Sequence, residues 1–121
     1  METLTKGSWL VLILVHVVPA LVLFVPSTAE KLYQVSPTGD VGLLLVHRGA
    51  LFLGLIIACV YAIFDPSLRR AMSVIVAVSL IGFLFTYWRG GMPSGALRKL
   101  ALVDSFALIP LAFVTFRAWR G

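Results

Sequence analysis

The sequence predicts an all-α protein, a bundle of four transmembrane helices, and three observations carry that prediction: composition, apolar runs and interfacial residues. Of its 121 residues, 60% are hydrophobic and only 12% are charged. The mean hydropathy is +1.03, whereas a soluble domain is nearer about 45–50% apolar and about 25% charged. We therefore expect a single membrane domain covering residues 1–121, with little mass outside the bilayer.

Four apolar runs supply the predicted spans. They cover residues 8–25, 41–64, 71–88 and 97–119, and each is near the ~20 residues that cross ~30 Å of hydrocarbon. Aromatic and basic residues such as Trp88 and Arg120 lie at several ends of the runs, as in interfacial belts. The connections are short, which favours an antiparallel up-down-up-down order of the helices.

The first run has two interpretations, and so has the connection that follows it. One interpretation is a cleaved signal peptide, because Lys6 would supply its charged start and the small residues after Pro26 resemble a cleavage site. The apolar stretch is longer than a usual signal core, which favours a retained helix. The connection 26–40 contains Leu32, Tyr33 and Val35 among polar residues, and we expect a short interfacial helix there rather than a free loop.

The net charge of +5 does not indicate nucleic-acid binding, because the basic residues sit at helix ends, where they anchor spans to headgroups. No basic run is interleaved with aromatic residues in a soluble module. Five basic residues fall on the side of the N-terminus and four on the other, a narrow excess that favours a cytoplasmic N-terminus.

The strongest functional signal is a set of polar residues inside the apolar runs. Ionisable groups in a bilayer are costly and usually face a bundle interior, a cavity or a partner. Counted from the span boundaries on one membrane face, these residues lie about 9–14 Å deep. The predicted ligand-binding residues are His16, His47, Arg48 and Asp104.

Arg48 and Asp104 form the expected pair, since neither charge is stable alone in hydrocarbon. One interpretation is a buried ion pair that fixes helix register without any ligand. The other is a cavity in which Arg48 engages an anionic or carbonyl-bearing ligand. A third is Arg48 extending to the interface without a partner.

Proline and small residues predict where helices bend and pack. Pro19 frees the carbonyl of Val15 close to His16, and Pro110 does the same in the last span, so either could border a cavity. A ridge of small residues in the second span, Ala50, Gly54, Ala58 and Ala62, suits close helix packing. In the third span Ser79, Gly82 and Thr86 share one stripe, which suits packing or a polar pathway. The single cysteine, Cys59, is expected to be a small packing residue.

The two histidines leave haem or metal open as alternative cofactors. Haem ligation requires His16 and His47 to face one another at matched depth, but their depths differ by ~4–5 Å. A metal site of His16, His47 and Asp104 has suitable ligand types but no diagnostic spacing. No sequence motif of a soluble hydrolase, metalloprotease or thiol oxidoreductase occurs.

Three segments resemble small bacterial four-helix membrane proteins of DoxX-like size and layout. These are His16-Val17-Val18-Pro19, the stretch from His47 to Phe52, and Val103-Asp104. The resemblance implies a four-helix fold and a bacterial inner (plasma) membrane location. DoxX relatives are linked to thiosulfate–quinone oxidoreduction, which hints at quinones, but no catalytic residue of that family maps onto this chain.

Three functions follow as hypotheses. The first is an intramembrane polar pocket that binds a lipid-like or quinone-like amphiphile. The second is an accessory or assembly subunit, in a homo-oligomer or a membrane complex, with a structural Arg48–Asp104 pair. The third is an integral-membrane enzyme acting on a lipid, with His16 and Asp104 as acid and base. A channel would require oligomerisation.

Overall fold

The computed structural model describes residues 1–120, which are all-helical, with 84% helix and no strand among them. The elements in chain order are α1 (Glu2–Leu21), α2 (Thr28–Tyr33), α3 (Gly39–Phe64), the 3₁₀ turn η1 (Pro66–Leu68), α4 (Arg69–Arg89) and α5 (Ala96–Arg120). Four helices are long and apolar enough to cross a membrane: α1, α3, α4 together with η1, and α5. The prediction of four apolar helices is confirmed.

The first helix differs most from its predicted span, because it begins at Glu2 and ends at Leu21 rather than covering residues 8–25. The polar start is helical because hydrogen bonding continues into it, for example from Thr5 to the carbonyl of Met1. After Pro19 the hydrogen bonds shorten to the three-residue type, from Val22 to Pro19 and from Leu23 to Ala20. Such tightening commonly ends a helix.

The connection after α1 contains α2, so the expected short helix is present. Gln34 follows it in the left-handed conformation, with φ of 57°, and turns the chain towards α3. Tyr33, Val22 and Ala29 form a small buried cluster there. The connection therefore packs against the bundle.

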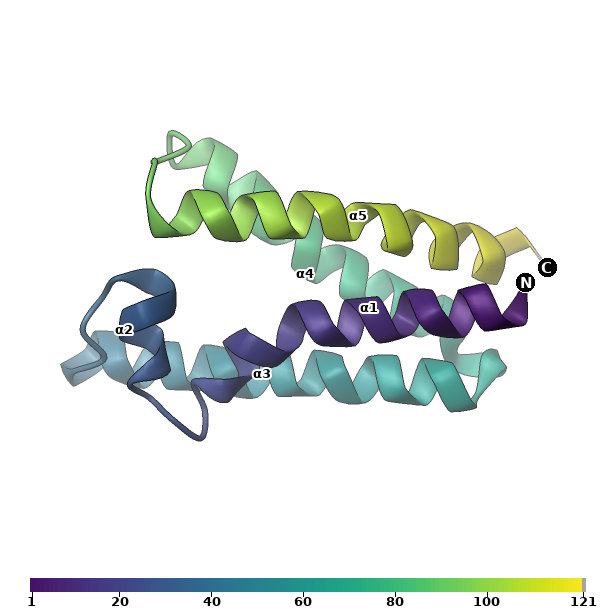
Figure 1. The fold of residues 1–121 in the computed structure, drawn as a ribbon, viewed down its shortest axis with the longest axis horizontal. Coiled ribbons are helices and arrows are strands. Elements are labelled where there is room, and N and C mark those ends of the chain that lie inside the picture. Colours follow the sequence, from purple (N-terminus) through teal and green to yellow (C-terminus); the bar gives the residue numbers. More distant parts are fainter. Residues whose placement is uncertain (121) are drawn as a thin grey trace.

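The packing of the helices is uneven. Helix α1 packs against α3 and α5, and α4 packs mainly against α5, whereas contact between α3 and α4 is sparse. Figure 1 shows why: α4 leaves α3 near η1 and runs obliquely away from it. Both termini lie at the η1 end of the molecule, here called the termini end, and α2 lies at the other, the α2 end (Figure 1).

All four long helices contribute to the main core. Its fully or almost fully buried members come from every one of them: Trp9, Leu12, Cys59, Ala62, Val76, Leu80, Ala107, Leu111 and Val114. Cys59 is 0% exposed within this cluster. This placement agrees with its interpretation as a packing residue.

The ridge of small residues predicted in the second span is only half used. Ala58 and Ala62 are buried, but Gly54 is exposed, with no atom within 4 Å of the place a Cβ would take. The close approach is instead made by Gly49, where a Cβ would lie 2.6 Å from the backbone nitrogen of Leu23. The four-residue spacing therefore predicted the packing of Ala58 and Ala62 correctly. The close backbone contact is made by Gly49, which is not part of the predicted ridge.

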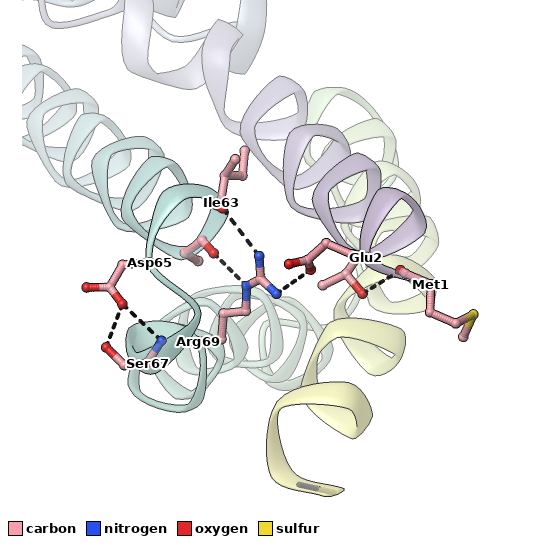
Figure 2. A network of polar contacts seen from close by, with 8 residues as sticks. Met1, Glu2, Ile63, Asp65, Ser67 and Arg69 are labelled. Carbon is pink, nitrogen blue, oxygen red and sulfur yellow. Dashed lines mark hydrogen bonds and ion pairs between the residues drawn. The ribbon is translucent and has the colours of Figure 1, made fainter.

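Arg69 closes the corner between α3 and α4 (Figure 2). Its side chain is almost buried, and Nε and Nη2 donate to the carbonyls of Ala62 and Ile63 at 2.7 and 3.3 Å. Nη1 pairs with a carboxylate oxygen of Glu2 at 2.6 Å. Carbonyls in the last turn of a helix have no partner within it, so Arg69 satisfies the end of α3 and ties it to α1. From its position at a helix end, Arg69 was expected only to anchor a span at the interface.

Candidate functional site

Arg48 lies near the α2 end of α3 and is enclosed by aromatic rings. Its Nε donates to the hydroxyl of Tyr33 at 3.2 Å. Its guanidinium carbon is 4.9 Å from the ring centre of Phe52, 5.5 Å from that of Phe83 and 5.6 Å from that of Tyr33. Each such cation–π contact contributes about 0.5–2 kcal/mol, more when desolvated. Three elements, α2, α3 and α4, therefore hold this cation in place.

The expected ion pair between Arg48 and Asp104 does not form. Within residues 1–120 the one ion pair is that of Arg69 with Glu2. Arg48 is taken up by Tyr33 and the aromatic rings, while Asp104 reaches the same cavities from α5 without bonding to it. The two residues lie at similar depths along their helices, as expected. Arg48 nevertheless bonds to Tyr33 and packs against aromatic rings, and it forms no ion pair with Asp104.

His16 is the most buried polar side chain near Arg48, with 1% of its surface exposed. Its Nδ1 lies 2.7 Å from the carbonyl oxygen of Leu12. Because a carbonyl can only accept, Nδ1 carries the hydrogen, and in the neutral ring Nε2 is an acceptor. Nε2 is buried without a hydrogen-bond partner among the described residues. A buried acceptor left unpaired is unusual in a native fold and calls for a ligand or a water.

Two neighbouring cavities are both lined by Arg48 and Asp104. The inner one, about 20 Å³, is lined by His16, Pro19 and Tyr33 among others, and holds about one water molecule. The outer one, here called the lateral groove, has a volume of about 360 Å³ and opens between α3 and α4. Both cavities are lined by the same four residues, Arg48, Phe52, Phe83 and Asp104, which we call the neck.

The lateral groove follows from the divergence of α3 and α4 (Figure 1). Its walls are apolar on the α3 side, with Leu51 and Leu55. On the α4 side Ser79, Gly82 and Thr86 line it, so the stripe seen in the sequence faces the groove rather than a packed helix. A Cβ at Gly82 would meet no atom within 4 Å. The stripe therefore lines a groove, together with Val78 and Phe83, and does not serve as a helix-packing face.

Both prolines border a cavity, as predicted from the sequence. Pro19 lines the inner cavity beside His16. Pro110 lines a separate apolar seam between α1 and α5.

His47 does not join the cluster. It is exposed on the outside of α3 and lines neither cavity. Successive residues on a helix are rotated by about 100°, so turning Arg48 inward turns His47 out. The two residues are adjacent in the chain and so lie at similar depths, but depth does not determine which way a side chain faces.

The positions of the two histidines also argue against the predicted haem and metal sites. His16 is inside the bundle and His47 outside, so they cannot face one gap. In the part of the chain that the structure describes, no three histidine, cysteine or acidic side chains come together as ligands.

Two members of the site were missed in the sequence. Tyr33 was read only as an apolar residue of the connection, and Phe83 as part of a span. Their signal was weak, because an aromatic residue near an interface usually belongs to the belt. Only the packing of α2 against the bundle reveals that they enclose Arg48.

No known protein family, no curated protein and no solved structure matches this chain. The likeness to DoxX-like proteins therefore remains an expectation, and any function rests on the geometry of the site.

Proposed function

We propose that this chain is an integral membrane protein whose lateral groove binds an amphiphile, with a polar head at the neck and an apolar tail between α3 and α4. The four long helices would cross the bilayer as an antiparallel up-down-up-down bundle, as the alternating ends in Figure 1 suggest. Five basic residues gather at the termini end: Lys6, Arg69, Arg70, Arg117 and Arg120. That excess favours placing this end in the cytoplasm.

The observation that carries the proposal is the state of Arg48. It is a permanent cation with no carboxylate partner within residues 1–120, and it sits where a side opening of the bundle narrows. A charge at that depth is costly without a counter-group. A carbonyl or anionic head lying against the guanidinium would supply one, and the apolar wall of the groove would accept the tail.

The dimensions of the two cavities limit the ligand. A volume of about 360 Å³ lies at the lower end of the range for small-molecule sites, about 300–1,000 Å³. The inner cavity is too small for a ring or a glycerol unit. We therefore expect the head to stop at the neck and to reach His16 Nε2 through one water or one hydroxyl group.

These properties fit a quinone-like or lipid-like head. Arg48 offers donors to a carbonyl, and the neutral His16 ring offers an acceptor to a water or hydroxyl hydrogen. A quinone or quinol, or an ester lipid with a free hydroxyl group, presents both kinds of group. The bacterial inner membrane, expected from the DoxX-like resemblance, contains both classes.

The enzyme hypothesis requires the same bound head at the neck. Asp104 lines the lateral groove, and His16 lines the inner cavity of about 20 Å³, which admits one water. General acid–base catalysis requires hydrogen-bond reach to the substrate, directly or through one water. Binding at the neck is common to both hypotheses and is therefore the function that we propose.

The accessory-subunit hypothesis keeps one specific observation. Gly54 is exposed in mid-α3 with open space around it, and small residues of this kind let a second helix approach closely. Gly54 does not itself line the groove, so this role is compatible with ligand binding.

The test compares two glycine substitutions in detergent-purified protein. Gly82→Leu fills the groove, whereas Gly54→Leu adds the same side chain to an open outer face. Native mass spectrometry with lipid extraction would follow amphiphiles that co-purify, and a decyl-substituted benzoquinone would serve as the added probe. We expect Gly82→Leu to lose the bound molecule and Gly54→Leu to keep it.

Arg48→Leu gives the second arm of the test. Removing a charged hydrogen-bond donor should weaken binding of the benzoquinone by about 10- to 100-fold. Retention of the same ligand by both Gly82→Leu and Arg48→Leu would refute the proposal.

A further inference from the structure

A second cavity lies at the opposite end of the molecule from the neck. It is a polar cleft of about 470 Å³ at the termini end, between the start of α1, the η1 corner and the end of α5. Three arginines line it, Arg69, Arg70 and Arg117, together with Thr5 and Ser67. No acidic residue is among its lining residues, but Glu2 pairs with Arg69, so one of the three positive charges has an acidic partner.

The three arginines are not equivalent. Arg69 is occupied by two carbonyls of α3 and by Glu2, as Figure 2 shows, and its charge is compensated. Arg70 donates from Nε to the carbonyl of Ala118 at 2.9 Å and stacks 5.4 Å from the ring centre of Trp119. These contacts fix Arg70 without neutralising it. Within residues 1–120 neither Arg70 nor Arg117 is ion-paired, so the cleft holds two cations that no carboxylate contacts directly.

A separate apolar seam is lined by neighbouring parts of the same two helices, α1 and α5. It has a volume of about 390 Å³ and lies between α1 and α5, with Leu4, Ser8 and Phe113 among its lining residues. Phe113 is one helical turn from Arg117, and Leu4 is next to Thr5 in the chain, so seam and cleft adjoin on both helices. The seam is almost wholly apolar, so its lining suits a hydrocarbon chain.

We propose that cleft and seam together bind one anionic phospholipid. Its phosphate would lie between Arg70 and Arg117, whose planar guanidinium groups suit two-point hydrogen bonding to phosphate oxygens. One acyl chain would follow the seam. Basic pockets between transmembrane helices at an interface are known to take anionic headgroups. This inference needs the helices to lie in a membrane, as proposed above, but it does not depend on the lateral groove.

Charge selects the lipid class. A zwitterionic lipid brings an ammonium group of its own close to Arg70 and Arg117, which have no ion-pair partner within residues 1–120, and like charges there are unfavourable. A phosphatidylglycerol or a phosphatidic acid brings only the anion. We therefore expect selection for net negative headgroups.

The experiment uses the full chain in phosphatidylcholine nanodiscs that contain a minor fraction of phosphatidylglycerol. Native mass spectrometry after release of the protein counts the phosphatidylglycerol molecules that remain bound. The double variant Arg70→Gln/Arg117→Gln should lower retention by about thirtyfold relative to the unchanged chain, because two interfacial charges are lost. The control Arg89→Gln/Arg120→Gln removes the same charge outside the cleft and should retain the lipid.

Three results would overturn the inference. Equal retention by the two double variants would show that charge in the cleft does not hold the lipid. Equal retention of phosphatidylcholine would remove the headgroup selectivity. Displacement of the lipid by millimolar inorganic phosphate alone would make the cleft a free-anion site.

Ser8→Phe supplies an independent readout, since it fills the seam while leaving every arginine in place. It should release phosphatidylglycerol, and unchanged retention would refute the acyl-chain part of the inference. Gly82→Leu should leave this lipid bound, which separates failure here from failure of the groove proposal.

Discussion

Replacing Arg69 with methionine should destabilise the protein by about 3 kcal/mol. The structure shows two charged hydrogen bonds from Arg69 to carbonyls at the end of α3, at 2.7 and 3.3 Å. Each bond to a charged group contributes at least about 1.5 kcal/mol, and no other side chain in the described structure replaces them. Methionine retains the buried volume, so the loss reflects the bonds rather than a cavity.

The assay is unfolding in mixed micelles of mild detergent and dodecyl sulfate, followed by circular dichroism at a helical wavelength. Arg70→Met is the matched control, because Arg70 is exposed and gives only one bond to a carbonyl. Glu2→Gln should cost little, since the Glu2 side chain is 54% exposed and water can replace its partner.

Arg69→Lys separates charge from geometry. A lysine keeps the charge but lacks the planar fork that reaches two carbonyls and a carboxylate together, so it should lose most of the stability that Arg69→Met loses. If Arg69→Met unfolds within about 0.5 kcal/mol of the unchanged chain, as neutral surface variants do, the capping role assigned to Arg69 is wrong.

Three further predictions concern packing and the neck. Gly49→Ala should destabilise by about 2 kcal/mol, because its Cβ would meet backbone at 2.6 Å, whereas Gly54→Ala should be neutral or stabilising in the same unfolding assay. Tyr33→Phe should cost about 1 kcal/mol, as it removes the acceptor of Arg48; an unchanged midpoint would contradict the bond. Cys59, 0% exposed, should react slowly with a maleimide in mild detergent and fast after denaturation, and rapid labelling of the folded chain would contradict its burial.

Much of the fold was predictable, because the membrane imposes strong constraints on sequence. Four apolar runs gave four long helices, and three of the runs agree with α3, α4 and α5 within a few residues. The first helix was displaced because hydropathy ignores the hydrogen bonding that carries α1 into polar residues. The relative depth of His16, Arg48 and Asp104 was also predictable, since rise per residue is constant, and all three line the inner cavity.

Rotation and partner choice were not predictable. Depth says nothing about which way a side chain turns, so His47 was included although it faces outward. Coulomb's law alone pairs Arg48 with Asp104, but the structure gives Arg48 a hydroxyl and three aromatic rings instead. Arg69 was missed for a related reason. In a sequence, a basic residue that anchors a helix end to headgroups cannot be distinguished from one that caps a neighbouring helix.

The groove is encoded by residue size as well as by helix direction. A gap between two diverging helices could be closed by large apolar side chains, as in the core at Leu80. On the α4 side Phe83 reaches Arg48, but the residues beside it, Ser79, Gly82 and Thr86, are small and leave the gap unfilled. At the other end of the same two helices, Arg69 holds α3 against the α4 corner. One end is thus fixed and the other left open by small residues, which is the arrangement expected of a site that admits a ligand from the side.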